Sequence, residues 1–279
     1  MNPTRIHRAV SADGTEIAGR VIGDGPALVL VHGGIGDGES AWDAMLGHLT
    51  DRFTCYLPST RGRGLSADDP DHSPPRLVDD VAAYVDSIGE PVYAVGWSGS
   101  GAWVLGAAAR SDAVAAVAVY EPTLIPLMSA EGLAEALDTM QQVGARAADG
   151  QLIEALHAFG SWICTEEERA ALAQTNFDEV WAMRVPAMLR FVQQDGSYKG
   201  PRSTDPGALA RITVPVLVLT GQRTRLQPFF SAAARFIAQH VADPQVWEVP
   251  GAGHFAPLLA PESVADELIT FFQSARQPA

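Results

Sequence analysis

The sequence predicts an α/β protein: a doubly wound, mostly parallel sheet of eight strands with an inserted helical lid. The segments Ala27–Val31 and Val214–Leu219 are near-continuous apolar runs, the pattern of strands covered on both faces of a parallel sheet. Similar short runs alternate with helical patterns along most of the chain, which is typical of a parallel sheet with helices on both faces. One long stretch breaks this alternation and predicts the lid.

We expect eight strands, in chain order Arg5–Val10, Glu16–Ile22, Ala27–Val31, Phe53–Leu57, Pro91–Val95, Val114–Tyr120, Val214–Thr220 and Gln245–Val249. Asp13-Gly14 lies between the first two and predicts that they form an antiparallel hairpin. We expect the helices of the core at Ala41–Leu49, Leu77–Ile88, Gly101–Arg110, Pro228–His240 and Pro261–Phe272. Pro228 and Pro261 stand near helix starts, where the missing N–H costs little.

The stretch from Pro122 to Arg211 has no strand pattern of comparable strength and predicts a block of helices. Apolar residues recur at helical spacing in two segments: Leu133, Leu137 and Met140, then Leu152, Leu156, Phe159 and Ile163. A third helical segment, Phe177–Val192, is interrupted at Pro186. We therefore expect a core formed by residues 1–121 and 211–279 and a helical lid formed by residues 122–210.

Composition and charge are those of an ordinary soluble globular protein. The chain has 279 residues, 47% hydrophobic and 19% charged, so a disordered, collagen-like or coiled-coil chain is excluded. Its 33 acidic and 19 basic side chains give a net charge of −14, which disfavours nucleic acids and anionic membranes as partners. No apolar run approaches the roughly 18 residues of a membrane span, and residues 1–10 resemble no secretory signal. We expect a cytoplasmic protein with Cys55 and Cys164 as buried thiols.

The segment Gly96-Trp97-Ser98-Gly99-Ser100-Gly101 follows a strand pattern and opens a helical one. It resembles the nucleophile elbow, G-x-S-x-G, of the α/β-hydrolase family, with Ser100 in a final position that needs only a small residue. Such a turn holds the nucleophile in a strained backbone at the top of the sheet. We expect Ser98 as the nucleophile, since Ser100 in that role would require the strand to end later.

The resemblance extends to two further loops. His32-Gly33-Gly34 follows the central apolar strand, where the family's loop supplies one of the two N–H groups that bind the oxyanion. The register implies Gly34 and Gly99 as the oxyanion-hole residues and gives His32 a structural role. Gly251-Ala252-Gly253-His254 follows the last strand, and the resemblance implies His254 as the base that takes the serine proton.

The third member of a triad departs from the family's common pattern. The acid usually follows the strand predicted at Val214–Thr220, but Thr224 holds that place, and threonine cannot balance an imidazolium charge. Glu121 comes directly after the preceding strand, Val114–Tyr120, and neighbouring strands of a doubly wound sheet end on the same edge. Haloalkane dehalogenases and zearalenone-type lactonases resemble this arrangement, and Tyr120-Glu121-Pro122-Thr123 is similar to the lactonases. We therefore expect Glu121 as the triad acid and little loss of activity from Thr224→Ala.

The motifs together predict a cofactor-independent serine hydrolase that cleaves a carboxylic ester or lactone through an acyl-enzyme on Ser98. The sequence has no metal-ligand spacing, dinucleotide loop or phosphate loop, so neither a metal nor a cofactor is expected. Aromatic and methionine side chains of the lid predict an apolar pocket for a medium-sized substrate. The candidate lining residues are Trp97, Met128, Phe159, Trp162, Trp181, Met188 and Phe191.

Other functions fit the same residues. A thioesterase or acyltransferase would use the same acyl-enzyme, and a carbon–carbon bond hydrolase would use the same triad. A ligand-binding receptor on a retained hydrolase fold belongs to a different class. Its ligand would stabilise it without turnover, and Ser98→Ala would leave binding unchanged.

Overall fold

The computed structural model describes residues 5–275 and confirms the predicted fold class. Residues 1–4 and 276–279 of the predicted core lie outside the described part of the chain. The eight-stranded sheet has the order β1-β2-β4-β3-β5-β6-β7-β8. β2 pairs antiparallel with β1, as the Asp13-Gly14 turn predicts, and with β4, whereas every neighbouring pair from β4 to β8 is parallel. The strands are β1 (Arg5–Val10), β2 (Glu16–Gly23), β3 (Ala27–Val31), β4 (Thr54–Pro58), β5 (Val92–Trp97), β6 (Val114–Tyr120), β7 (Pro215–Gly221) and β8 (Asp243–Val249).

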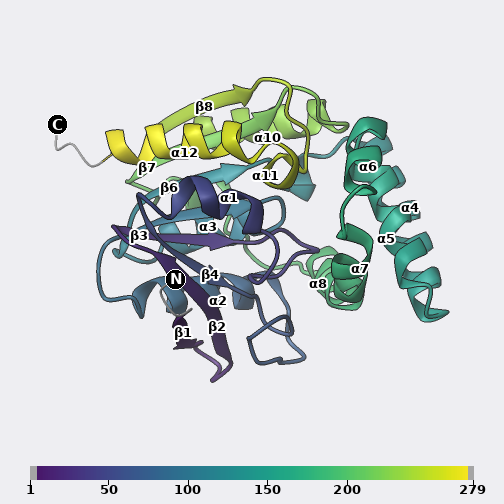
Figure 1. Cartoon of the computed structure of the whole chain (residues 1–279), viewed down its shortest axis with the longest axis horizontal. Helices are drawn as coiled ribbons and strands as arrows, with labels where there is room; N and C mark the ends of the chain where they lie inside the picture. The colour runs from purple at the N-terminus through teal and green to yellow at the C-terminus, as the bar shows by residue number, and fades with distance from the viewer. Residues whose placement is uncertain (1–4, 276–279) are drawn as a thin grey trace.

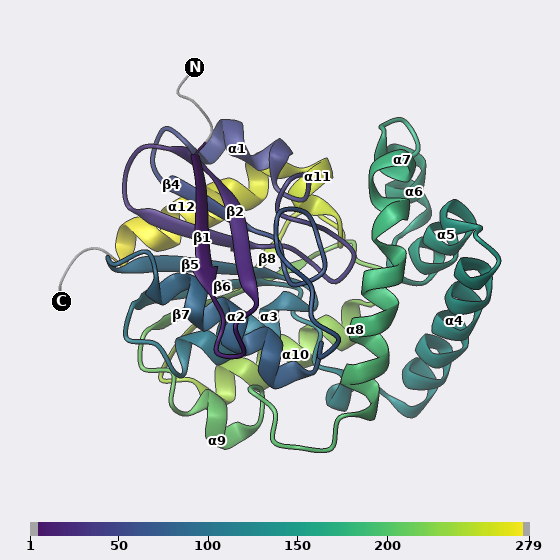
Figure 2. The same cartoon turned by 90° about the horizontal axis from the view of Figure 1, so that it is seen from below.

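Helices cover both faces of the sheet (Figure 2), and strand side chains alternate between two hydrophobic clusters. In β3, Leu28 and Leu30 join the cluster of α1 and α12, whereas Ala27, Val29 and Val31 join that of α2, α3 and α10. The unbroken apolar pattern of β3 thus reflects burial on both faces. On the first face lie α1 (Asp43–Leu49), α11 (Ala256–Leu259) and α12 (Pro261–Ser274), and on the second α2 (Pro74–Asp86), α3 (Ser100–Ala108) and α10 (Gln227–His240).

The chain between β6 and β7 forms a helical insertion on the side to which the parallel strands point (Figure 1). Among the helices α4 to α8, α8 lies nearest to the core, and α4 and α5 lie outermost (Figure 2). Helix α9 packs on the core helices α3 and α10, so the chain has returned to the core by this helix. The division of the chain at residues 122 and 210 stays a prediction. The elements are η1 (Ile125–Leu127), α4 (Ala130–Ala148), α5 (Leu152–Ile163), α6 (Glu166–Leu172), α7 (Phe177–Trp181), η2 (Ala182–Arg184), α8 (Val185–Ser197) and α9 (Pro206–Leu209).

The predicted helical segments of the insertion are confirmed, but the buried face of α4 differs from the predicted stripe. Helix α4 buries Ala136 and Val143, while Leu133 and Leu137 are 37% and 63% exposed. Ala136 and Val143 join the same cluster as Ala155 of α5, so small side chains bring the two helices together.

Two boundaries within the insertion also differ from expectation. Pro186 does not interrupt a helix but lies in the first turn of α8, where its missing N–H costs little, and the break falls at η2 just before it. Helix α6 was not predicted. It begins with a capping box, in which Thr165 and Glu168 satisfy each other's backbone N–H groups, and this T-x-x-E pattern was a usable signal.

Cys55 and Cys164 are free and buried, as predicted. Within residues 5–275, no helix combines the length and the apolar character needed to span a bilayer. The same part of the chain holds no group of three His, Cys, Asp or Glu side chains placed to bind a metal ion.

Candidate active site

Ser98 occupies a strained turn between β5 and α3. Its φ is +58°, a left-handed conformation that non-glycine residues seldom adopt. The strand and helix approach so closely that a Cβ at Gly96 would lie 2.8 Å from the carbonyl oxygen of Ser100. A Cβ at Gly101 would lie 2.7 Å from Cβ of Pro122, in the turn after the neighbouring strand β6. Gly96 and Gly101 are therefore required by the packing, and Ser98 remains partly exposed at the tip of the turn.

Ser100, the second hydroxyl of the turn, serves the backbone. Its side chain is fully buried. Its Oγ accepts from Trp97 N at 2.9 Å and donates to the carbonyl oxygen of Val31 at 2.8 Å, so it ties β5 to β3. Both capacities of the hydroxyl are used in this way, and the geometry is that of a structural residue.

Glu121 lies directly after β6 and also has a positive φ, +45°. Its backbone N donates to Leu219 O at 2.8 Å, which fixes the turn against β7. The side chain is completely buried. Oε1 accepts from Gly221 N at 2.8 Å, and Oε2 accepts from the Thr224 hydroxyl at 3.1 Å, so a buried carboxylate is held by donors from the end of β7 and from the loop after it.

His254 joins Ser98 and Glu121 in one line of hydrogen bonds. Nδ1 lies 2.6 Å from Glu121 Oε2, and Nε2 lies 3.1 Å from Ser98 Oγ. Because the carboxylate can only accept, Nδ1 carries the proton and the lone pair of Nε2 faces the serine hydroxyl. The imidazole stacks on Phe230 with centroids 5.1 Å apart and planes 13° apart, which fixes the ring plane.

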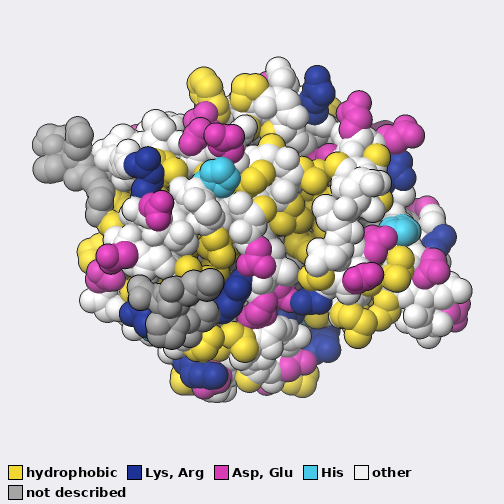
Figure 3. Space-filling view, in the orientation of Figure 1, with side chains coloured by type: hydrophobic (Ala, Val, Ile, Leu, Met, Phe, Trp, Pro, Cys, Tyr) yellow, Lys and Arg dark blue, Asp and Glu magenta, His cyan; other side chains and the backbone are white. Residues whose placement is uncertain are grey.

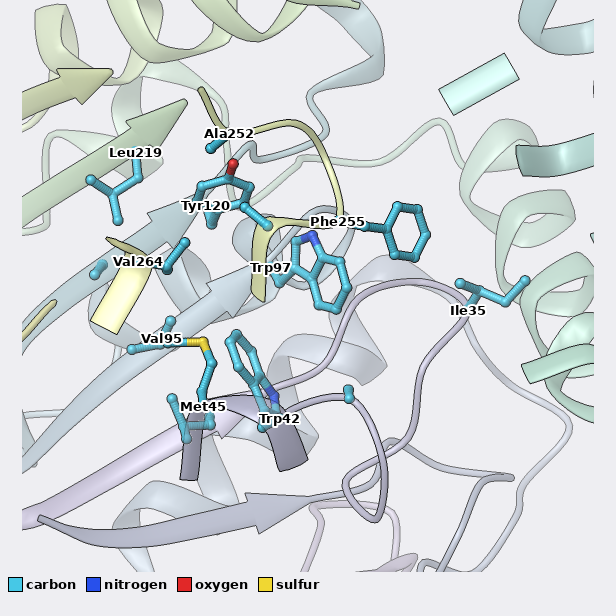
Figure 4. Close-up of a cluster of buried hydrophobic side chains, with 14 of the residues drawn as sticks. Ile35, Trp42, Met45, Val95, Trp97, Tyr120, Leu219, Ala252, Phe255 and Val264 are labelled. Atoms are coloured by element: carbon cyan, nitrogen blue, oxygen red, sulfur yellow. The ribbon is translucent and has the colours of Figure 1, made fainter. Parts of the chain in front are cut away.

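The loop that carries His254 is anchored from below by β5 and β6. Trp97 Nε1 donates to His254 O at 3.0 Å, and the Tyr120 hydroxyl donates to Gly253 O at 2.5 Å. Figure 4 shows Trp97 and Tyr120 beside this loop, which also carries Ala252 and Phe255. Trp97 was expected to line a substrate pocket, but the structure places it in the core as a support of this loop.

Two further side chains at the site were missed in the sequence. Thr123 Oγ1 lies 3.3 Å from Ser98 Oγ, and Thr123 N donates to Ser98 O at 3.1 Å. Glu168 of α6 accepts from Phe255 N at 2.8 Å and so connects the insertion to the histidine loop. The position of Thr123, two residues after Glu121, could have marked it, whereas the contact of Glu168 depends on tertiary packing alone.

The structure places Gly34 and Gly99 side by side: a Cβ at Gly99 would lie 3.7 Å from Cα of Gly34. Within residues 5–275, neither glycine's N–H has a hydrogen-bond acceptor. Gly99 also caps the N-terminus of α3, where backbone N–H groups favour negative charge. This arrangement can bind an oxyanion beside Ser98.

Of the expected lining residues of the insertion, Phe191 comes closest to these glycines. Its ring atoms would lie 3.3 Å from a Cβ at Gly34 and 3.4 Å from one at Gly99, and the ring packs edge-on against Trp103. Trp181 packs on Trp97 and Phe255, and Met188 is buried in the same cluster. Three expected lining residues remain. Met128 and Phe159 are half-buried, and Trp162 borders a polar groove of about 550 Å³ between α4 and α5.

His32 has the structural role expected of it. Nδ1 donates to Gly33 O at 2.8 Å, and Nε2 accepts from Thr60 N at 3.0 Å. The side chain is fully buried. Burial, and then the nearby positive charge of Arg63, lower the pKa of His32 to about 3.

We expect this buried histidine to weaken the fold in mild acid. The unfolded imidazole takes up a proton below about pH 6.5, whereas the folded one stays neutral down to about pH 3, so protons favour the unfolded chain. Over this range His32 alone lowers the free energy of unfolding by about 1.4 kcal/mol per pH unit. Urea unfolding of the wild type and of His32→Gln at several pH values measures the difference, and parallel curves of stability against pH would contradict it.

Comparisons with known proteins agree with this architecture. A model of the alpha/beta hydrolase family matches residues 28–267. A pimeloyl-[acyl-carrier protein] methyl ester esterase from Xanthomonas campestris pv. campestris is 33% identical over 261 residues, which cover 90% of this chain and 96% of that protein. A 2-(acetamidomethylene)succinate hydrolase from Mesorhizobium japonicum is 26% identical over 96% of both chains. The crystal structure of an esterase from Rhodococcus sp. ECU1013 superposes with a TM-score of 0.77 at 23% identity, covering 97% of this chain and 99% of that one.

Proposed function

Since this chain belongs to the alpha/beta hydrolase family and is a hydrolase, we propose that it cleaves carboxylic esters or lactones through an acyl-enzyme on Ser98. The observation that carries the proposal is the line of hydrogen bonds from Ser98 Oγ to His254 Nε2 and from His254 Nδ1 to Glu121, at 3.1 and 2.6 Å. This is the arrangement by which a base activates a serine hydroxyl and a carboxylate fixes the base. The esterase names of similar proteins support an ester as the substrate.

In the acylation step, Ser98 Oγ bonds to the carbonyl carbon while its proton passes to His254 Nε2. The carbonyl oxygen takes up the electron pair of the double bond and accepts from the N–H groups of Gly34 and Gly99. As the C=O bond re-forms, the bond to the leaving oxygen breaks, and the imidazolium returns its proton to that oxygen. The Glu121 carboxylate balances the imidazolium charge throughout.

In the deacylation step, a water molecule attacks the acyl-enzyme and gives a proton to His254. The second tetrahedral oxyanion uses the same two N–H groups. Its collapse breaks the bond to Ser98 Oγ, which recovers its proton from the imidazolium. The products are the carboxylic acid and the alcohol, or one hydroxy acid when the substrate is a lactone.

We propose an apolar, medium-sized substrate from the surroundings of the two glycines. The ring of Phe191 lies against both, and Trp103 backs that ring, so the wall beside the candidate oxyanion hole is aromatic. Hydrophobic side chains also gather along the seam between the core and the helical insertion (Figure 3). Such walls favour an acyl chain over a charged group.

A fluorophosphonate probe tests the proposed nucleophile. We expect the folded protein to be labelled once, at Ser98, and mass spectrometry of the peptides identifies the modified residue. A panel of p-nitrophenyl esters, lactones and thioesters, with Ser98→Ala as control, then identifies the acyl donor class. A folded protein that binds panel compounds but neither labels nor turns over would be a receptor, and the proposal would be wrong.

For the wild type, we expect kcat/KM to rise with the acyl chain of p-nitrophenyl esters, by up to about fourfold per methylene from acetate to hexanoate. Each methylene buried against the aromatic wall strengthens binding of the transition state. Phe191→Ala removes part of this wall, so we expect a flatter dependence on chain length, whereas the same truncation on α5, Phe159→Ala, keeps the slope. An acetate ester hydrolysed faster than the longer esters would rule out the apolar pocket.

A further inference from the structure

We propose that Thr224 is a positioning residue of the active site, whose hydroxyl holds the Glu121 carboxylate in place for His254. This inference rests on the proposed function and deepens it. The hydroxyl of Thr224 lies 3.1 Å from Glu121 Oε2, the same oxygen that lies 2.6 Å from His254 Nδ1. Thr224 thus occupies the position after β7 at which the family resemblance expects the triad acid. Its hydroxyl binds Glu121, the acid that follows β6 instead.

The carboxylate of Glu121 needs such donors because it is completely buried. A buried charge is stable only where hydrogen bonds replace its hydration. Among residues 5–275 three groups donate to it: Gly221 N to Oε1, and Thr224 Oγ1 and His254 Nδ1 to Oε2. Thr224 is the single side-chain donor in this set that does not take part in proton transfer.

The direction of the hydrogen bond follows from the chemistry of the two groups. A carboxylate only accepts, so the Thr224 hydroxyl donates to Oε2. Two donors then bind the same oxygen, and Oε2 cannot move away from His254 without disturbing the bond to Thr224. The bond to the imidazole is the shorter one, 2.6 Å against 3.1 Å, so the hydroxyl orients the carboxylate without displacing the imidazole.

Thr224 itself lies on a loop that is tied to the histidine loop. Gln222 N donates to Val249 O at 3.1 Å, and Arg223 N donates to Ala252 O at 2.7 Å. The side chain of Thr224 is 6% exposed, so it does not swing freely in solvent. The loop after β7 therefore fixes the donor in the same frame as the imidazole.

Donation from Thr224 also disperses the negative charge of Oε2. Without it, more of the charge stays on Oε2, and the carboxylate attracts the proton at His254 Nδ1 more strongly. Other ionisable groups pack against the two loops: Tyr120 bonds Gly253 O, Glu168 bonds Phe255 N, and Arg225 bonds Glu135 and Trp162 O. These contacts do not involve the Thr224 hydroxyl, so a change confined to it leaves them in place.

The test compares Thr224→Val, which keeps the shape and removes the donor, with Thr224→Ser, which keeps the donor. We expect Thr224→Val to lower kcat on a p-nitrophenyl ester about tenfold or more, with KM within about twofold. We expect the acid limb of its kcat/KM profile to move to higher pH. Thr224→Ser restores both values. A melting temperature for each variant separates these effects from loss of the fold.

A second readout does not depend on turnover. The proton between His254 Nδ1 and Glu121 gives a low-field NMR resonance, assigned by its loss in Glu121→Gln. We expect Thr224→Val to shift this resonance and Thr224→Ser to keep it near its wild-type position. Valine and serine variants with the same kcat, pH profile and resonance would overturn the role of Thr224. An inactive wild type whose resonance still responds in this way would overturn the proposed function and leave the role of Thr224 standing.

Discussion

Ser98→Ala is expected to lower kcat on any hydrolysed ester by about six orders of magnitude, as loss of a serine nucleophile does in a comparable triad. Ser100, the other serine of the turn, cannot take its place because it is buried and bonded to the backbone on both sides. The variant is expected to fold, because within the described residues Ser98 Oγ hydrogen-bonds only to His254 and Thr123. Steady-state rates and circular dichroism measure both effects.

Ser100→Ala is the matched control. It leaves the N–H of Trp97 without its partner inside the core, so we expect a loss of about 1–3 kcal/mol in the free energy of unfolding. The folded fraction of this variant keeps its activity and its fluorophosphonate label. If Ser98→Ala retained a tenth of the wild-type rate while Ser100→Ala was inactive, the nucleophile would be Ser100.

The parts of the site that could be predicted are those fixed by local sequence. The elbow around Ser98 requires glycines within a few residues on either side, because strand and helix backbones nearly touch there. The central strands are recognisable because both of their faces are buried, as in β3. The ends of β6 and β7 lie on one edge of the sheet, so a carboxylate after β6 was a reasonable candidate once Thr224 occupied the place after β7.

What the sequence could not provide were contacts made by distant segments. The expectation that Thr224→Ala costs little rests on the missing charge of threonine, whereas the bond from its hydroxyl to Glu121 is visible only in the fold. The contact of Glu168 with Phe255 N depends on how α6 docks against the core. The buried face of α4 follows from its partner α5, so the apolar stripe of Leu133 and Leu137 was misleading. Each of these features depends on a neighbour that local periodicity does not specify.

Glu121→Gln is expected to lower kcat by about four orders of magnitude with little change in KM. Glutamine keeps the shape of the side chain, but Gly221 N donates at 2.8 Å and demands the amide oxygen on its side. The amide NH2 then faces His254 Nδ1, which must accept. The imidazole consequently carries its proton on Nε2, where it points at Ser98 Oγ and cannot take the serine proton.

Glu168→Gln provides the control for a buried glutamate near the same loop. Its two oxygens accept from Phe255 N and Thr165 N, so glutamine loses one of these bonds and lowers stability. In the described part of the chain no imidazole nitrogen hydrogen-bonds to Glu168, so we expect kcat of the folded protein to change by less than about tenfold. Equal losses of kcat in both variants would show that Glu121 acts on the fold and not on the tautomer of His254.

A double variant that moves the carboxylate from the end of β6 to the loop after β7 tests the same geometry. In Glu121→Ala the carboxylate is lost, and Gly221 N and His254 Nδ1 are left without an acceptor. The hydroxyl of Thr224 already reaches to 3.1 Å from the oxygen that served the imidazole, and the carboxylate of an aspartate at 224 extends one atom further. We therefore expect Glu121→Ala/Thr224→Asp to be at least about tenfold more active than Glu121→Ala. The single variant Thr224→Asp, which keeps Glu121, should instead lose activity, because two buried carboxylates at this distance cannot both stay ionised. A double variant as inactive as Glu121→Ala would mean that the loop after β7 cannot present an acid to His254, and that the carboxylate after β6 has no substitute in this protein.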